Sequence, residues 1–178
     1  INDLFNVENK VAVVTGGSRG IGEMITAGFL ANGVKVYISA RKAPALIEKA
    51  NELSEKYEAE CIAIPCDLST SEGIDEFYNS VEKNESGIDF LINNAGAAWG
   101  EPLESFSEKG WDKVMDLNVK SIFFLTQKFK NLLSQKATES DPSRIINIGS
   151  IDGLNVPSME TYSYGASKAA VHHLTRVL

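Results

Sequence analysis

The chain has 178 residues, of which 43% are apolar and 23% are charged, so it can bury one hydrophobic core and is expected to form one domain. Its 24 acidic residues outnumber the 17 basic ones and give a net charge of −7, which argues against a protein that binds nucleic-acid phosphates. No stretch approaches the roughly 18 apolar residues of a membrane span, and the first ten residues do not resemble a secretory signal. We therefore expect a cytoplasmic protein without a nucleic-acid or membrane partner.

Apolar segments typical of β-strands alternate with amphipathic segments typical of α-helices along the chain. Strands are expected at residues 10–15, 34–40, 60–66, 88–93 and 144–150, and helices near residues 20–32, 43–58, 70–84, 107–135 and 163–178. This alternation, with unbroken runs of valine and isoleucine, favours a parallel sheet covered by helices on both faces. The predicted fold class is α/β, a three-layer doubly wound parallel sheet that is Rossmann-like. Pro65 fits this sheet only at a strand end or on an edge strand, because proline cannot donate to the ladder.

The two ends of the chain and its two cysteines carry further information. Residue 1 is Ile rather than Met, and residues 163–178 read as a helix that stops without a capping signal. We therefore expect a single domain over residues 1–178 that is incomplete at its C-terminal end, truncated within its last helix. Cys61 and Cys66 have a spacing that suits neither a disulfide framework nor a zinc site, so two buried reduced thiols and no metal site are expected.

The segment TGGSRGIG at residues 15–22 lies between the first predicted strand and the first predicted helix. A glycine turn in this place lets the backbone approach a diphosphate, and the helix N-terminus supplies N–H donors. A P-loop is excluded because Glu23 and Met24 stand where that motif has lysine and a hydroxyl residue. The G-x-G-x-x-G pattern is also absent; the segment reads T-G-x-x-x-G-x-G. A purely structural turn is the alternative interpretation.

The end of the second predicted strand indicates which dinucleotide would bind. An acidic residue there favours NAD, whereas the 2′-phosphate of NADP needs cations. The sequence has Arg41 and Lys42 at this place, and the glycine turn adds Arg19. On a chain of net charge −7 this clustering predicts NADP(H) as the cofactor, with ordinary surface charge as the alternative.

The segment ETYSYGASK at residues 160–168 contains two tyrosines and one lysine. Residues four apart share a helix face, so Tyr164 can meet Lys168, whereas Tyr162 has Ala166 at that position. Bringing a phenol from a pKa near 10 to about 7–8 requires roughly 3–4 kcal/mol. An ammonium about 4 Å away supplies roughly 4 kcal/mol at an effective dielectric near 20. Tyr164 is therefore predicted to be a general acid and base.

Two other polar residues are candidates for the same site. Ser150 is the last residue of the fifth predicted strand, and positions 148 and 152 lack the glycines of a nucleophile elbow. We expect its hydroxyl to polarise a substrate carbonyl, with a turn or helix cap as the alternative. Asn118 is the single amide in the apolar stripe of the fourth predicted helix, where it either holds a bend or loop or supports a water chain to Lys168. His172 and His173 have no predicted partner and are assigned to the helix surface or a subunit contact.

The motifs TGGSRGIG, CDL, NNAG, DLNVKS, NIGS and YGASK occur in the order typical of short-chain dehydrogenases/reductases, and the chain closely resembles this family from Lys10 to Leu178. It is similar to NADPH-dependent β-ketoacyl-carrier-protein reductases. The resemblance implies a catalytic tetrad of Asn118, Ser150, Tyr164 and Lys168. It also implies a cofactor site lined by Gly16, Ser18, Arg19, Gly20, Ile21, Arg41, Asp67, Leu68, Asn94, Tyr164 and Lys168.

The function implied by the resemblance is NADPH-dependent reduction of a ketone such as a 3-oxoacyl thioester, with Tyr164 as the general acid. The alternatives are an NADP-dependent alcohol or steroid dehydrogenase and a sensor that binds NADP(H) without chemistry. The expected partner is a small-molecule or acyl-thioester carbonyl substrate. The resemblance also implies a homo-oligomer formed through the helix from Ser107 to Leu133 and the terminal helices. Residues that select the substrate are expected beyond Leu178.

Overall fold

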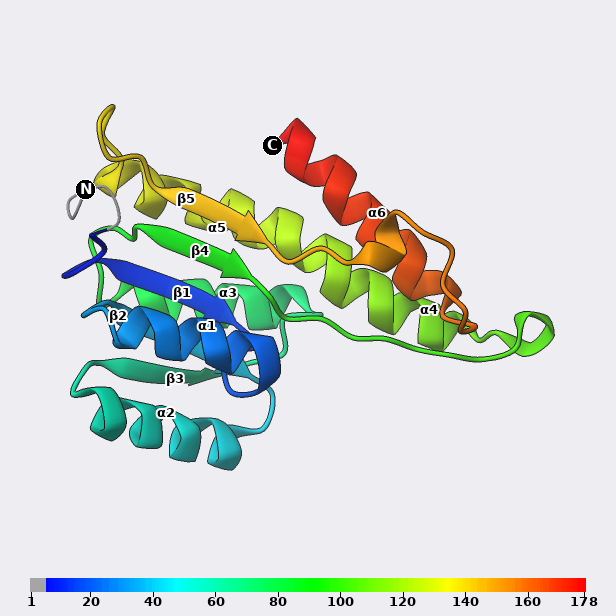
Figure 1. Ribbon diagram of the computed structural model, residues 1–178, viewed down its shortest axis with the longest axis horizontal. Helices are drawn as coiled ribbons and strands as arrows, with labels where there is room; N and C mark the ends of the chain where they lie inside the picture. Colours follow the sequence, from blue (N-terminus) through cyan, green and yellow to red (C-terminus); the bar gives the residue numbers. More distant parts are fainter. Residues whose placement is uncertain (1–5) are drawn as a thin grey trace.

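The computed structural model describes residues 6–178, and its centre is a parallel β-sheet with helices on both faces (Figure 1). The strands are β1 (Val11–Thr15), β2 (Lys35–Ala40), β3 (Cys61–Pro65), β4 (Phe90–Asn93) and β5 (Arg144–Asn147). They pair in the order β3-β2-β1-β4-β5, and every pair is parallel. The predicted α/β class with a doubly wound sheet is confirmed.

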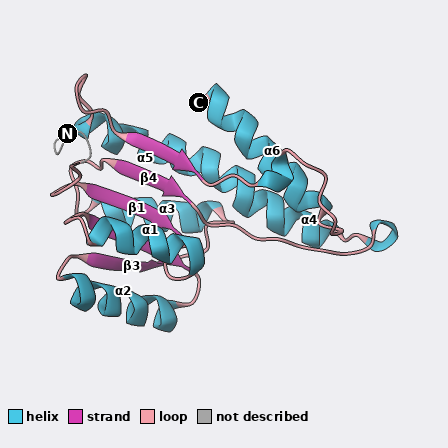
Figure 2. Ribbon diagram, viewed as in Figure 1, coloured by secondary structure: helices cyan, strands magenta, loops and turns pink. Residues whose placement is uncertain are grey.

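Helices follow the strands in alternation, as Figure 2 shows by colour. They are α1 (Gly20–Leu30), α2 (Ala43–Tyr57), α3 (Ser71–Glu82), α4 (Glu108–Met115), α5 (Ser121–Lys136) and α6 (Tyr162–Val177). Two short 3₁₀ turns, η1 (Leu103–Ser105) and η3 (Ile151–Gly153), lie in the loops. Within residues 6–178, no helix has both the length and the apolar composition that crossing a bilayer requires.

The core lies in two layers, one on each face of the sheet. Successive side chains of a strand point to opposite faces, and β1 is buried on both. Val14 packs into the cluster that Leu30 of α1 and Leu46 of α2 complete. Val13 packs into the opposite cluster with Phe77 of α3 and Phe129 of α5. Burial on both faces explains why the strands are continuous apolar runs rather than alternating ones.

The strand boundaries refine the predictions at two places. Pro65 is the last residue of β3, which is an edge strand, so its missing N–H interrupts no ladder between two neighbours. The predicted strand 144–150 ends earlier, at Asn147. Ser150 therefore lies in the loop after β5, where it precedes the η3 turn.

The fourth predicted helix, residues 107–135, is present as one unbroken helical segment, but its repeat is not regular. α4 is followed by a π-helical turn, η2 (Asp116–Lys120), before α5 begins. A π-turn inserts a residue into the helical repeat and shifts the faces on either side of it. Val114 and Asn118 are both buried, whereas Trp111, which a regular helical repeat would place on the same face as Asn118, is 42% exposed.

Both cysteines are free and buried, as predicted. Burial raises the pKa of the Cys61 thiol and of the Cys66 thiol to about 12. Neutral thiols are poor nucleophiles, so neither residue is a candidate for covalent chemistry at neutral pH.

Candidate active site

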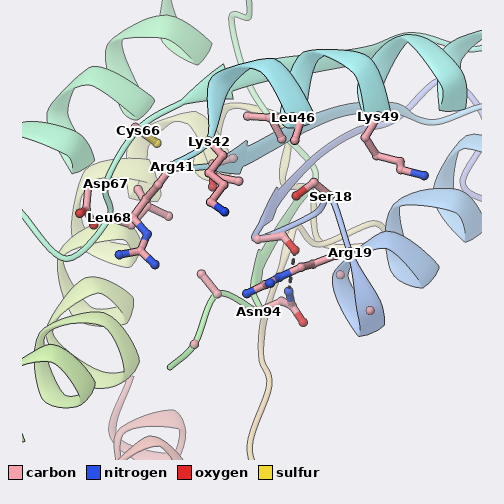
Figure 3. A pocket seen from close by; sticks show the side chains of 18 of the residues that line it. Ser18, Arg19, Arg41, Lys42, Leu46, Lys49, Cys66, Asp67, Leu68 and Asn94 are labelled. Atoms are coloured by element: carbon pink, nitrogen blue, oxygen red, sulfur yellow. Dashed lines mark hydrogen bonds between the residues drawn. The ribbon is translucent and has the colours of Figure 1, made fainter. Parts of the chain in front are cut away.

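A cleft of about 840 Å³ opens where β1, β2 and β3 end; we call it the cofactor cleft (Figure 3). Its wall comes from the segments that follow β1, β2, β3 and β4, which meet at the carboxyl edge of the sheet. All predicted cofactor residues except Tyr164 and Lys168 line it, namely Gly16, Ser18, Arg19, Gly20, Ile21, Arg41, Asp67, Leu68 and Asn94.

The glycine turn between β1 and α1 is shaped by close backbone contacts. Gly16 has a φ of 66°, in the left-handed region that suits glycine. A Cβ at Gly22 would overlap the Gly16 carbonyl oxygen and the Asn94 side-chain amide. Asn94 Nδ2 donates to the carbonyl oxygens of Thr15, at 2.9 Å, and of Gly16, at 3.2 Å. The end of β4 therefore holds the turn in place, and the turn has no room for a side chain at position 22.

The start of α1 is open to a ligand. Its N-cap residue, Arg19, makes no side-chain capping hydrogen bond. The first N–H groups of a helix have no partner within the helix, so those of α1 can bind a phosphate oxygen. This arrangement supports the predicted diphosphate site.

Positive charge gathers in the cofactor cleft. Figure 3 shows the side chains of Arg19, Arg41 and Lys42 extending into the same opening, from the glycine turn and from the end of β2. Asp67 stands beside Arg41. Burial pushes the pKa of Asp67 up, but the hydroxyl and amide of Ser69 and the charge of Arg41 outweigh burial and hold that pKa below its usual value. The carboxylate is therefore charged at neutral pH, and it interacts with Arg41 in a cleft that Arg19 and Lys42 also line.

α6 carries the predicted general acid and its lysine on one face. Lys168 is buried, and its Nζ donates to the Ile148 carbonyl at 2.6 Å and lies 5.8 Å from the centre of the Tyr164 ring. Burial lowers the pKa of Lys168. Tyr162 is engaged elsewhere, because its ring packs edge-on against Phe106 at 5.7 Å. The structure thus pairs Lys168 with the tyrosine that helical spacing selects.

Asn118 connects the loop after β4 to α6. Its Oδ1 accepts from the Ala97 amide at 2.8 Å, and its Nδ2 donates to the Ala97 carbonyl at 2.9 Å and to Ser167 Oγ at 3.0 Å. The Ser167 hydroxyl in turn donates to the Tyr164 carbonyl at 2.7 Å. Of the two alternatives for Asn118, these contacts support the holding of a loop. A water chain to Lys168 remains a prediction.

Ser150 lies at the start of η3, opposite α6. Its Oγ accepts from the Asp152 amide at 3.2 Å, which is the turn-capping contact expected as the alternative. An accepting hydroxyl keeps its own proton, so Ser150 can cap the turn and still donate to a substrate oxygen. The two interpretations are compatible.

A family model described as short chain dehydrogenase matches residues 10–178. The chain belongs to this family. The rhamnolipids biosynthesis 3-oxoacyl-[acyl-carrier-protein] reductase of Pseudomonas aeruginosa is 44% identical over 174 residues, which are 98% of this chain and 67% of that protein. Dehydrogenase/reductase SDR family member 11 of Gallus gallus is 36% identical over 171 residues, covering 95% and 66%.

Solved structures of this family agree. The Pseudomonas aeruginosa RhlG/NADP active-site complex has a TM-score of 0.93 at 44% identity, covering 97% of this chain and 67% of its own. L-sorbose reductase from Gluconobacter frateurii, complexed with NADPH and L-sorbose, has a TM-score of 0.89 at 29% identity, covering 97% and 64%. The predicted resemblance to short-chain dehydrogenases/reductases, and to 3-oxoacyl carrier-protein reductases in particular, is confirmed.

The contacts of two polar residues at this short-chain dehydrogenase site were not predicted from the sequence. Lys49 of α2 lines the cofactor cleft, where it pairs with Glu23 at 3.1 Å and Glu52 at 2.6 Å. His172 was assigned to the helix surface or a subunit contact, but it contacts the loop after β5, with Nε2 3.4 Å from the Ser150 amide. His172 lies four residues after Lys168, just as Lys168 lies four residues after Tyr164. This spacing places His172 on the same helix face and could have indicated its location near the site.

Proposed function

We propose that this short-chain dehydrogenase is an NADPH-dependent carbonyl reductase that transfers hydride to a ketone such as a 3-oxoacyl thioester, with Tyr164 as the general acid. Its cofactor is NADP(H). The observation that carries the proposal is the placement of Arg19, Arg41 and Lys42 in one cleft, because a 2′-phosphate needs cations where NAD would need an acid. The RhlG and L-sorbose reductase complexes, which contain NADP and NADPH, support this cofactor.

The residues around α6 supply what a carbonyl reduction needs from the protein. Bound NADPH provides the hydride for the carbonyl carbon. Tyr164 then gives its proton to the substrate oxygen as negative charge develops there. Lys168 lies against the ring of Tyr164 and favours the charged form that remains after the transfer. Ser150 donates a hydrogen bond to the same substrate oxygen.

Asn118 acts at a distance from the substrate in this proposal. Through Ser167 it fixes the turn of α6 that carries Tyr164. A proton donor is effective only when it is held in the productive geometry before the reaction. Asn118 therefore serves as a positioning residue.

The protein acts as a homo-oligomer in this proposal. α5 exposes two neighbouring phenyl rings, Phe123 and Phe124, which pack edge to face with centres 5.3 Å apart. Exposed aromatic pairs of this kind are typical of surfaces that a partner covers. Light scattering during size-exclusion chromatography measures the assembly, and a monomeric mass would contradict this part of the proposal.

Tyr164→Phe in the full-length protein tests the proposed reaction, with Tyr162→Phe as the matched control. Removing a general acid costs about 100- to 10,000-fold in rate. We expect Tyr164→Phe to lose ketone-dependent NADPH oxidation by this factor while its Kd for NADPH stays within about twofold. Tyr162→Phe should turn over like wild type.

Three outcomes would contradict the proposal in different ways. Undiminished turnover by Tyr164→Phe would remove Tyr164 as the general acid. Tight NADPH binding without turnover of acetoacetyl thioesters, free ketones or sugars by the wild type would favour a sensor. Turnover confined to alcohol oxidation would favour an alcohol or steroid dehydrogenase.

A further inference from the structure

α6 is fastened along one face to the segment that leaves β5. Near its middle, Lys168 Nζ donates to the Ile148 carbonyl at 2.6 Å. Near its end, Thr175 Oγ1 accepts from the Asn147 side-chain amide at 3.0 Å. His172 lies between these two on the same helical face, because residues 168, 172 and 175 follow the spacing of four and three. The helix and the segment after β5 are therefore held at a fixed distance on both sides of His172.

His172 fills the space between α6 and the backbone of the two residues before η3. Its Nε2 accepts from the Ser150 amide at 3.4 Å. A Cβ at Gly149 would overlap Nε2 of His172 and would lie 2.8 Å from Cδ2 and 3.6 Å from Cε1, and these ring atoms are its nearest neighbours. The imidazole thus lies directly against Gly149, and only a residue without a side chain fits there.

The chemistry of this contact defines the state of the ring. A nitrogen that accepts from an amide uses its lone pair, so this contact requires the tautomer of His172 that carries its proton on Nδ1. Nδ1 is buried and has no hydrogen-bond partner among residues 6–178. Within the described chain, the Ser150 amide is therefore the specific polar contact of His172.

We propose that His172 is a positioning residue for Ser150, which assigns this ring a part in the reaction and rests on the proposed function. The His172 ring holds the Ser150 amide from the side of α6, and the Asp152 amide holds Ser150 Oγ from the side of η3. The two contacts together fix both ends of the serine, its backbone and its hydroxyl. A hydroxyl that stabilises developing charge must be preorganised, and His172 supplies that restraint.

The first experiment measures turnover in the full-length protein. His172→Leu keeps most of the volume and removes the acceptor, and His172→Gln restores an acceptor. We expect His172→Leu to lower kcat about 3- to 10-fold, as for loss of one neutral hydrogen bond, while KM for the ketone and Kd for NADPH stay within about twofold. His172→Gln should recover most of kcat. His173→Leu, an exposed neighbour on α6, is the matched control and should behave like wild type.

A double-mutant cycle separates positioning from a general effect on folding. If His172 acts through the serine hydroxyl, His172→Leu costs less than about twofold when Ser150→Ala has already removed that hydroxyl. The same loss in both backgrounds, or no loss in His172→Leu, would overturn the inference. If the wild type reduces no ketone at all, the proposed function fails, which is a different result from a wild-type-like His172→Leu.

A second experiment tests the contact without any chemistry. Gly149→Ala should lower the melting temperature by roughly 3–10 °C, because the added methyl meets the His172 ring. Adding His172→Ala should restore at least half of that loss, since the smaller side chain makes room for the methyl. The decrease in the melting temperature of the double variant could instead equal the sum of the decreases in the two single variants. That result would show that the ring does not define the space around Gly149, and it would overturn the inference.

Discussion

The cofactor cleft and the region formed by residues 147–153 and 162–178, which we call the α6–β5 region, hold their polar side chains in different ways. In the cofactor cleft, Arg41 and Lys42 are exposed and extend into an opening from a backbone that the end of β2 fixes. In the α6–β5 region, Lys168 is buried and bonded to a carbonyl twenty residues away. The cofactor cleft thus exposes its charged side chains, whereas the α6–β5 region holds Lys168 in place by burial and a hydrogen bond.

The difference follows from what each region does in the proposed reaction. A cation that binds a phosphate gains its hydrogen bonds when the ligand arrives, so it can remain solvated until then. A proton donor must already be in position, because misplacement by about 1 Å can cost roughly 100-fold in rate. We therefore expect substitutions in the cleft to change affinity and substitutions in the α6–β5 region to change turnover.

The largest effect on stability is expected at Gly22, where the cofactor cleft has no room for an added side chain. Gly22→Ala places a methyl group against the Gly16 carbonyl oxygen, and backbone atoms cannot move aside as a flexible side chain can. We expect a loss of about 3 kcal/mol in the free energy of unfolding, together with loss of NADPH binding. Urea denaturation and cofactor fluorescence measure both.

Gly28→Ala is the matched control for Gly22→Ala. Both glycines lie in α1, but nothing lies within 4 Å of a Cβ at Gly28, which is exposed. Alanine in an exposed helix interior is better than glycine by about 0.5–1 kcal/mol, so Gly28→Ala should stabilise the protein slightly. A Gly22→Ala protein as stable as Gly28→Ala would contradict the close packing of the turn.

Asn118 joins the two regions, and its removal tests whether they depend on each other. Asn118→Ala leaves the amide and carbonyl of Ala97 without their partner. We expect a loss of about 2 kcal/mol in the free energy of unfolding, with a lower kcat because Ser167 loses its anchor. Asn84→Ala is the control, because it removes an exposed side-chain amide that donates to the Ser80 carbonyl four residues earlier. It should change neither the free energy of unfolding nor kcat. If Asn118→Ala changed only NADPH affinity, the residue would belong to the cleft alone.

Features with a short sequence range were predictable in both regions. The alternation of strands and helices, the glycine turn and the pairing of Tyr164 with Lys168 follow from spacings of a few residues, and the cations after β2 follow from composition at one place. In α5, Ile122, Leu125 and Phe129 continue the spacing of four and three from Asn118 and are buried, as a regular apolar stripe predicts. Regular spacing failed at η2, because a π-turn is stabilised by what its residues contact rather than by their order.

Long-range partners explain what the sequence could not show. Asn118 is separated from Ala97 by 21 residues and from Ser167 by 49, so its spacing alone did not distinguish a loop anchor from a water chain. His172 is 22 residues from Ser150, and its contact requires both the end of β5 and the glycine at position 149. A local pattern predicts the helix face on which such a residue lies. Which group the residue contacts depends on the fold.

The smallest expected effect is on the affinity for NADPH. It tests whether substitutions in the cofactor cleft change binding and leave turnover unchanged. Arg41→Ala removes one charged donor that is exposed and therefore contributes at the low end of the usual range, about 1.5 kcal/mol. We expect the Kd for NADPH to rise about tenfold and the Kd for NADH, which has no 2′-phosphate, to stay unchanged. Arg176→Ala, an exposed arginine on α6, should alter neither Kd. At saturating NADPH the kcat of Arg41→Ala should equal that of the wild type. A fall in kcat would mean that the cation also holds the reacting groups, and binding and positioning would then not be divided between the two regions.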